Sequence, residues 1–287
     1  MPMSPRLLRP KASGHPDANA WRAAVTANGG SVSGSTFAAV DKFCRDIDAA
    51  GIRNRFYRLN LFCGNSDASL NAVRTPLYRG PSRTGTQYGN TTDTNNNFVA
   101  GDYAENSGLK GNGSTKYLET GLPMTFLWSA ELHMFVSFNP EANDFFRCLI
   151  GARFNTTGAV SLENNYNGTD ANRPRGNIFN PVGTQPTNHL NPITGRSQYL
   201  MQWPGSGAHQ YFGRNVDLSN LSGNPVFSST FTTPFFIFTG EHPTTGIGSL
   251  SAQRIDSYSI GAAFTTTQNR TDFHNIMGTF RTALGRT

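Results

Sequence analysis

The hydrophobic pattern changes its period near residue 109, and this change is the feature that most constrains the fold. Beyond it, apolar residues alternate with other residues, and Leu132, Met134, Val136 and Phe138 share one face of a strand. Turn signals such as the Asn-Gly pair at 167–168 separate the segments, so the pattern predicts an antiparallel two-sheet sandwich. The expected strands are Thr115–Thr120, Leu132–Phe138, Phe145–Ala152, Ala159–Glu163, Gly176–Phe179, Gln198–Trp203, Gln210–Arg214, Pro234–Thr239 and Ile255–Phe264.

Helical spacing appears at both ends of the chain. A first helix is expected after Asp17 as its N-cap, and a second should begin at Ser35 or Thr36. The short apolar run 56–62 predicts a third helix that closes a small bundle. After residue 264, a C-terminal helix is expected with Thr266 or Thr267 as its cap. The apolar stripe of the second helix consists of Phe37, Val40, Phe43, Cys44 and Ile47.

These patterns divide the chain into four segments. Residues 1–16 form an extended arm, because their prolines exclude a regular helix. Residues 17–63 are the helical segment, and residues 64–96 form an irregular connection rich in turns. A connection of this length is expected to add short strands or to be held against the sandwich. Residues 97–287 are the sandwich with its closing helix.

The composition limits the classes of partner that the chain is expected to bind. Charged residues make up 15% of the chain, against about 25% in an average protein, and the net charge is +6. Arginine carries most of the positive charge and is spread along the whole sequence without a long basic run, which favours scattered surface cations over a specific nucleic-acid site. No stretch reaches the roughly 18 apolar residues of a membrane span. The first residues lack the apolar core of a signal peptide, so synthesis in the cytoplasm is expected.

Three cysteines at wide spacing argue against a disulfide framework and against a zinc site. Cys44 lies in an apolar helical stripe and Cys148 in an apolar run, so both are expected to be small buried side chains. A bridge between Cys44 and Cys63 is compatible with the sequence but is not implied by it.

Three sequence motifs resemble one known family. They are the segment Phe98–Tyr103 with the following Gly108–Leu118, the late strand Arg254–Gly261, and the closing residues Leu284–Arg286. Together they resemble concanavalin A-like lectin and laminin-G-like jelly-roll proteins of tailed-phage or prophage virions. The resemblance covers most of residues 97–287 and implies a mainly β fold, in which two antiparallel sheets form a jelly-roll sandwich with a small N-terminal helical segment and a C-terminal helix. The motifs are signatures of a fold and carry no chemistry.

The resemblance implies a virion structural protein, either a capsid decoration protein or an accessory protein of the head or tail. Its partners would be other virion proteins, its state a homo-oligomer, and its location the virion. The arm carries an apolar pair between cations, and it has no core of its own. We therefore expect it to anchor the protein on a partner through Arg6, Leu7, Leu8 and Arg9.

The sequence offers no catalytic residues, and an enzyme is not expected. Glycoside hydrolysis requires two carboxylates across a sugar site, and no closely spaced pair of acids lies on one predicted strand face. No nucleophile motif occurs, and the six histidines are widely separated. His133 is read as a solvent-face or interface residue rather than as a base. A divergent glycosidase remains the third alternative for function.

No cofactor is required, although calcium is one option because laminin-G-like domains often hold this ion. Asp93 and Asp102 supply hard oxygen ligands next to an asparagine-rich turn. The alternative role for such side chains is to cap the backbone of their own turns.

The second functional hypothesis is a glycan-binding module for adhesion to host-surface or environmental glycans. Such a site combines an exposed aromatic ring with neighbouring polar side chains, and two sets of residues fit. The alternative for the aromatic members is packing inside the sandwich. The first set is Asn164, Asn165, Tyr166 and Asp170, and the second is Trp203, His209 and Tyr211.

Overall fold

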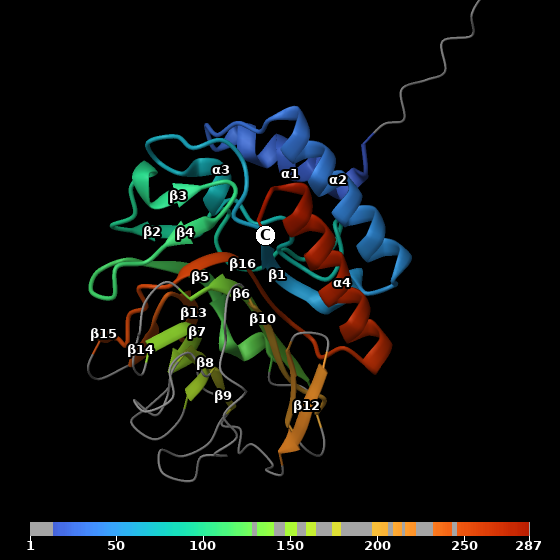
Figure 1. The fold of residues 1–287 in the computed structure, drawn as a ribbon, viewed down its shortest axis with the longest axis vertical. Coiled ribbons are helices and arrows are strands. Elements are labelled where there is room, and N and C mark those ends of the chain that lie inside the picture. The colour runs from blue at the N-terminus through green and yellow to red at the C-terminus, as the bar shows by residue number, and fades with distance from the viewer. Residues whose placement is uncertain are drawn as a thin grey trace, which may run out of the picture.

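The computed structural model describes residues 14–127, 131–140, 147–153, 159–164, 174–178, 197–205, 209–213, 216–221, 232–242 and 246–286. These residues form two antiparallel sheets and a layer of helices that covers one of them (Figure 1). The chain is therefore mainly β with a C-terminal helix, as the sequence predicted. Every expected strand overlaps an observed one.

The larger sheet has eight strands in the order β12-β11-β10-β6-β16-β4-β3, and β1 also pairs with β16. Strand β6 lies between β10 and β16, and the alternating residues that define it in sequence are all buried. The strands are β1 (Phe56–Asn60), β3 (Tyr103–Ala104), β4 (Gly108–Lys110), β6 (Leu132–Asn139), β10 (Ser197–Trp203), β11 (His209–Gly213), β12 (Val216–Leu221) and β16 (Arg254–Gly261).

The second sheet has six strands in the order β2-β5-β13-β7-β8-β9, and a two-stranded hairpin, β14-β15, lies beside it. The central strand β13 arrives late in the chain and inserts between β5 and β7. The strands are β2 (Thr94–Asn96), β5 (Tyr117–Pro123), β7 (Arg147–Arg153), β8 (Ala159–Asn164), β9 (Pro174–Ile178), β13 (Pro234–Ile237), β14 (Gly240–His242) and β15 (Gly246–Gly248).

One apolar core fills the space between the two sheets. Met134 and Val136 of β6 meet Leu118 of β5, Ile150 of β7 and Ile237 of β13 in this core. All five side chains are fully buried, as alternation on two facing sheets requires. The two sheets therefore form a sandwich.

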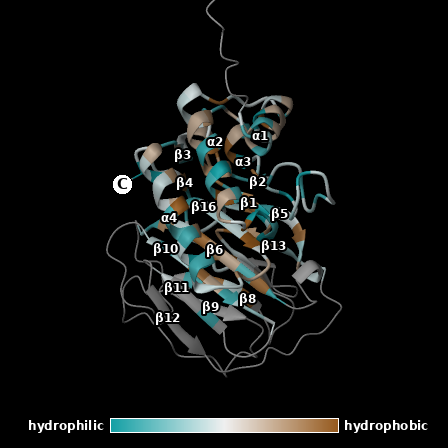
Figure 2. Ribbon diagram, turned by 90° about the vertical axis from the view of Figure 1, so that its right-hand side faces the viewer, coloured by the Kyte–Doolittle hydropathy of each residue, from teal (hydrophilic) through white to brown (hydrophobic). Residues whose placement is uncertain are grey.

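A second core lies between the larger sheet and the helices α1 (Pro16–Ala27), α2 (Gly34–Ala49) and α4 (Thr267–Ala283). Phe135 of β6 and Leu200 of β10 point into it, away from the sandwich core. The ring of Phe135 lies 4.8 Å from that of Phe273 on α4. Figures 1 and 2 show α4 alongside β6 and β10, with α1 and α2 beyond it. The helical segment is thus built onto the sheet.

The helix starts differ slightly from the sequence-based expectation. His15, not Asp17, precedes α1, and its ring Nδ1 accepts a hydrogen bond from the Asp17 N–H. Pro16 occupies the first turn, where its missing N–H costs nothing. Ser33 caps α2, which begins at Gly34, one or two residues before the predicted start, and Thr266 caps α4 as predicted.

The prediction of a short helix over residues 56–62 is wrong. Residues 56–60 form strand β1, which pairs antiparallel with β16. The run is apolar on both faces because Phe56 and Leu59 belong to the core under the helices, while Phe62 belongs to the core between the sheets. Periodicity cannot separate a short buried strand from a short buried helix.

The connection 64–96 contains the one-turn helix α3 (Asn71–Arg74) and ends in β2, the edge strand of the smaller sheet. A buried ion pair holds it: Asp93 and Arg58 of β1 are both fully inaccessible, with 2.6 Å between carboxylate oxygen and guanidinium nitrogen. Asn60 and Tyr258 also donate to Asp93. Burial lowers the pKa of the Arg58 guanidinium, but the charge and hydrogen bonds of Asp93 more than offset this and raise it.

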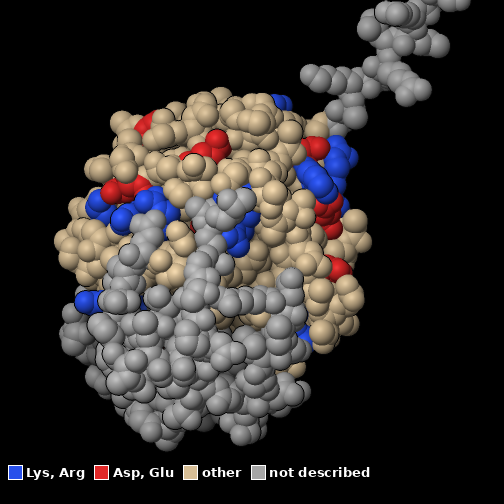
Figure 3. Space-filling model, in the orientation of Figure 1, with Lys and Arg blue, Asp and Glu red and all other residues tan. Residues whose placement is uncertain are grey.

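Several arginines stabilise the fold and do not contribute to a basic surface. Arg58, Arg270 and Arg286 are all at most 4% exposed. Arg286 donates to the carbonyl oxygens of Leu61, Phe62, Glu105 and Asp256, which attaches the end of the chain to the loop after β1. On the face in Figure 3, charged side chains are sparse and cations lie beside acids.

The three cysteines are free and buried, so the structure has no Cys44–Cys63 bridge. Burial raises the pKa of Cys44 and of Cys63 to about 12, which keeps both thiols protonated and unreactive. In the described parts of the chain, no helix combines the length and apolarity that crossing a membrane demands.

The buried pair gives a stability prediction. Replacing Asp93 by Asn leaves the charge of Arg58 uncompensated in the core, so Asp93→Asn is expected to lower the free energy of unfolding by about 3–5 kcal/mol. Chemical denaturation followed by circular dichroism measures this. The control is Asp46→Asn, which removes a partly exposed ion pair with Lys42 and should cost at most about 0.5 kcal/mol. Equal losses in the two variants would contradict the role given to Asp93.

Candidate functional site

The outer face of the six-stranded sheet is the candidate site, because no helix of the described chain packs against it. In β5, Leu118, Thr120 and Leu122 point into the sandwich core, which leaves Tyr117 and Glu119 on the outer face. Both are half-buried, so part of each side chain reaches solvent.

Phe236 of β13 continues this face. It lies directly opposite Glu119 of β5 and opposite Gly151 of β7, so these residues share one side of the sheet. Its ring lies 6.0 Å from that of Tyr117 at an angle of 60°. Phe236 is 4% exposed, and it forms an apolar floor beside the more accessible Tyr117.

Strand β8 adds polar groups to the same face. Ser161 pairs with Gly151, and its hydroxyl donates a hydrogen bond of 2.6 Å to Glu163. Gly151 is needed here because a Cβ atom would lie 2.8 Å from the Cys148 sulfur. We call Tyr117, Glu119, Ser161, Glu163 and Phe236 the outer-face set.

The outer-face set suits binding better than hydrolysis. The partly exposed Tyr117, which packs at an angle against Phe236, offers aromatic surface to a ligand, and the carboxylates of Glu119 and Glu163 offer hydrogen-bonding partners to a polyhydroxylated ligand. The Ser161 hydroxyl is 3% exposed and serves to position Glu163. Glu119 and Glu163 are separated by three strand spacings, about 14 Å. Paired glycosidase carboxylates stand about 5–10 Å apart. The backbone positions of these two acids are therefore farther apart than the carboxyl groups of such a pair.

The first predicted glycan-binding set falls mostly outside the described residues. Asn165, Tyr166 and Asp170 are not described, and Asn164 is placed only as the last backbone position of β8. The neighbouring Ser161 and Glu163 on the same strand are the described polar groups nearest to this set in sequence.

The second predicted set is divided between the sandwich interior and an outlying strand. Trp203 belongs to the core between the sheets and is 6% exposed, so it has the packing role that the sequence left as its alternative. His209 and Tyr211 lie on β11 next to β10, and their side chains are outside the described part of the structure. The arm residues Arg6, Leu7, Leu8 and Arg9 are also outside it.

The two predicted calcium ligands are both engaged by cations of the chain. Asp93 is buried against Arg58. Asp102 pairs with Lys116 and accepts a hydrogen bond from the Val99 N–H, which is the backbone-capping alternative. Among the residues that the structure describes, no cluster of three or more His, Cys, Asp or Glu side chains could hold a metal ion. Calcium binding there would require breaking both ion pairs.

His133 of β6 and His274 of α4 are both buried on the helix-covered side of the larger sheet, away from the outer-face set, and His133 packs against Phe56 and Phe264. The His133 nitrogens contact the carbonyl oxygen of Ala262 at 2.7 Å and the hydroxyl of Ser259 at 2.9 Å. Burial lowers the pKa of His133 to about 4 and that of His274 to about 3. Both side chains are neutral at pH 7. His133 is thus fully buried inside the fold and does not lie on a solvent face.

The sequence did not identify the outer-face set because its members come from strands that become neighbours only in the folded sheet. Alternation shows that Tyr117 and Glu119 share a face, but it does not show that Phe236 lies opposite them. The one local signal was the polar spacing of Ser161 and Glu163 within a single strand.

No family model and no curated protein matches the sequence. The structure is similar to a mutant of Trypanosoma rangeli sialidase that displays trans-sialidase activity, with a TM-score of 0.50 and 12% identity. That match covers 83% of this chain and 39% of the sialidase, so the chain spans about two-fifths of that protein. At this identity the likeness shows a shared fold alone.

Weaker likenesses exist to two other proteins. Domain 4 of the arabinanase AbnA from Geobacillus stearothermophilus, solved with arabinotriose, has a TM-score of 0.40 and 13% identity, with 57% of this chain and 74% of that domain covered. Botulinum neurotoxin type C, whose cell entry depends on two ganglioside molecules, has a TM-score of 0.43 and 7% identity over 58% of this chain and 42% of the toxin.

The buried histidines predict a loss of stability in mild acid. In the unfolded chain the pKa of these histidines is about 6.5. Below that pH the unfolded chain therefore binds protons at both histidines, whereas the folded chain does not until the pH approaches the lower folded pKa. Each histidine should then lower the free energy of unfolding by about 1.4 kcal/mol per pH unit, down to its folded pKa. Denaturation at pH 6.5 and 4.5 measures the total loss. The variant His274→Leu should lose less over this interval, and an unchanged loss would contradict the assignment.

Proposed function

We propose that this chain is a glycan-binding module whose ligand lies on the outer face of the six-stranded sheet. The observation that carries the proposal is the outer-face set itself: a partly exposed tyrosine packed against a buried phenylalanine, with two carboxylates on the same face, one of them positioned by Ser161. A sugar ring presents an apolar face and a rim of hydroxyl groups, and this set offers partners for both.

The charge of the set favours neutral sugars. Glu119 and Glu163 accept hydrogen bonds from hydroxyl groups, but they would repel a carboxylate on the ligand. In the strand register, Glu119 lies opposite the uncharged Thr94 and Phe236, whereas Glu163 lies opposite Arg175, so the negative charge that disfavours an acidic ligand is mainly that of Glu119. We therefore propose a neutral oligosaccharide in place of a sialylated one, and this preference distinguishes the chain from the sialidase whose fold it shares.

We propose binding without hydrolysis. The backbone positions of Glu119 and Glu163 are about 14 Å apart across the sheet, wider than the usual separation of acid and nucleophile. The two buried histidines, His133 of β6 and His274 of α4, lie on the helix-covered side of the larger sheet and cannot serve as bases for a ligand on the outer face of the other sheet. The likeness to a sialidase supports the sandwich and does not transfer its activity.

The jelly-roll connectivity and the virion role implied by the sequence resemblance stay predictions. So do the virion partners, the homo-oligomer and calcium. The proteins to which this structure is similar are two glycan-processing enzymes and a toxin, and they give no support for a capsid or tail location.

A glycan array with neutral and sialylated oligosaccharides tests the proposal. The protein should bind at least one neutral oligosaccharide, and Tyr117→Ala should weaken that binding about tenfold or more by removing the stacking surface, a loss of about 1.4 kcal/mol. Calorimetry or biolayer interferometry measures the change. The matched control is Tyr57→Ala, because Tyr57 is also half-buried and packs against an aromatic ring, that of Tyr88 at 5.5 Å.

Two results would count against this function. The first is an array with no neutral ligand in the presence or absence of calcium. The second is equal weakening by Tyr117→Ala and Tyr57→Ala, which would place the ligand away from the outer face. Release of reducing sugar from the bound oligosaccharide would contradict the proposal that the chain binds without cleaving.

A further inference from the structure

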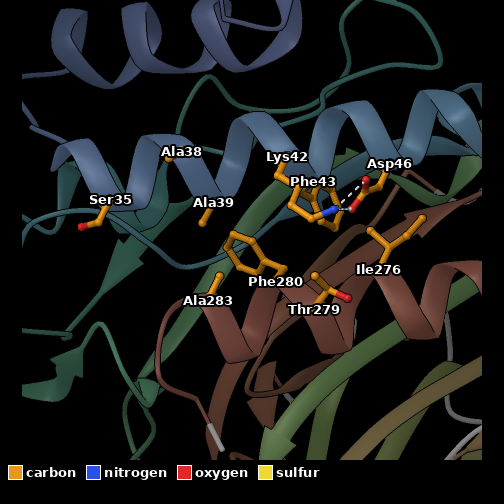
Figure 4. Close-up of a pocket in the computed structure, with 10 residues that line it drawn as sticks. All are labelled: Ser35, Ala38, Ala39, Lys42, Phe43, Asp46, Ile276, Thr279, Phe280 and Ala283. Atoms are coloured by element: carbon orange, nitrogen blue, oxygen red, sulfur yellow. Dashed lines mark hydrogen bonds and ion pairs between the residues drawn. The ribbon is translucent and has the colours of Figure 1, made fainter.

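An apolar groove of about 340 Å³ runs between α2 and α4 on the side of the molecule away from the outer-face set (Figure 4). Phe43 and Ile276 lie along it, and the ring of Phe280 points toward Ala39 between the two helices. The rim is more polar, because Lys42 and Asp46 form an ion pair at one end. The groove is thus a strip of aliphatic and aromatic surface with a charged edge.

The groove exists because the helices touch at one level and carry small residues at the next. Phe43 and Phe280 pack edge to face, with 5.6 Å between ring centres. One turn away, Ala38 and Ala39 of α2 face Ala283 of α4. Their methyl side chains are too small to fill the space between the two helices. A strip of this kind gains stability when another apolar side chain fills it.

We propose that Leu7 and Leu8 of the chain's own N-terminal segment occupy this groove. The segment, residues 1–13, lies outside the described residues, and apart from two methionines near its start these leucines are its only large apolar side chains. A groove of this volume is at the small end of ligand sites and suits a pair of aliphatic side chains.

The segment joins the described chain close enough to the groove for Leu7 and Leu8 to reach it. Gly14 lies against the ring of Phe37, and the His15 N–H donates to Asp41, so the chain enters on one flank of α2. The neighbouring residues Ala38 and Lys42 line the groove on the other flank. The two flanks are separated by one helix diameter, about 10–12 Å.

Five residues, and therefore six Cα–Cα steps, separate Leu8 from Gly14. They span up to about 20 Å when extended and about 12–15 Å on average when flexible. The average length matches the path over α2, which is the condition for the highest effective concentration, in the millimolar range. A second copy of the chain at micromolar concentration cannot compete with that, so the occupant is the segment of the same molecule.

Charge favours the same path. The segment carries Arg6, Arg9 and Lys11 and no acid, whereas the five charged residues of α2 include Asp41, Asp46 and Asp48. A basic segment that crosses α2 therefore passes over a helix with a net negative charge, which is favourable at moderate salt.

Disulfide cross-linking of the full-length protein tests the proposal. Leu8→Cys combined with Thr279→Cys places one thiol on the segment and one on the groove wall, and the three native cysteines are buried. Mild oxidation with copper-phenanthroline should give an intramolecular disulfide, seen as a faster-migrating monomer on a non-reducing gel. The matched control is Leu8→Cys with Gln268→Cys, an exposed site on α4 about 16 Å from position 279, which should cross-link at least fivefold more slowly.

A second measurement does not depend on new cysteines. The double variant Leu7→Asp/Leu8→Asp should speed amide hydrogen exchange in α2 and α4 around the groove, with no change in the six-stranded sheet. A disulfide-linked dimer would overturn the proposal in favour of segments exchanged between copies. Equal cross-linking at positions 279 and 268, or unchanged exchange in the double variant, would show that the segment does not occupy the groove.

Discussion

The fully buried ion pair between Arg58 and Asp93 is the interaction on which the arrangement of this molecule depends. Removing two charges from water costs several kcal/mol for each, and only close geometry with further hydrogen bonds offsets that cost. Here the guanidinium also donates to Tyr258 and to the carbonyl oxygens of Tyr88 and Asn90, while Asn60 donates to the carboxylate. The pair joins β1, the connection and β16, three segments that are far apart in sequence.

This attachment explains why the helical segment belongs to the sandwich. Strand β1 follows the two N-terminal helices and enters the larger sheet through β16, so those helices lie over that sheet. Arg286, just after α4, donates to the carbonyl oxygens of Leu61 and Phe62 in the loop after β1, and to those of Glu105 and Asp256. One sheet is therefore covered by helices from both ends of the chain. The outer face of the other sheet carries the proposed ligand site.

Local periodicity predicted the strands, and capping chemistry predicted the start of α4 at Thr266. Sequence patterns failed to predict the structure of a segment where that structure depends on residues far away in the chain. The run 56–60 is a strand because β16 pairs with it, and Asp93 is a counter-ion because Arg58 is buried beside it. The polar face of β6 resembles a solvent face in sequence, yet His133 and Ser137 are fully buried, His133 against Phe56 and Phe264. Phe135 on that same face was the sequence signal of a covering layer.

The candidate site was beyond prediction for a related reason. Its aromatic floor comes from β13, which follows β5 by more than a hundred residues and inserts beside it. The packing of the whole sheet sets the order of its strands. Alternation within one strand shows which residues share a face, but it carries no information about which strands become neighbours. Trp203, the more conspicuous aromatic in sequence, was used for the core instead.

Native-state hydrogen exchange followed by mass spectrometry tests most directly whether the buried pair makes helices and sandwich one cooperative unit. With increasing denaturant, the slowest amides of α1 and α2 and those of β6 and β16 should converge on one opening free energy, equal to that of global unfolding. Opening of the two helices at a clearly lower free energy, while the strands stay protected, would contradict this account and make the helical layer an independent unit.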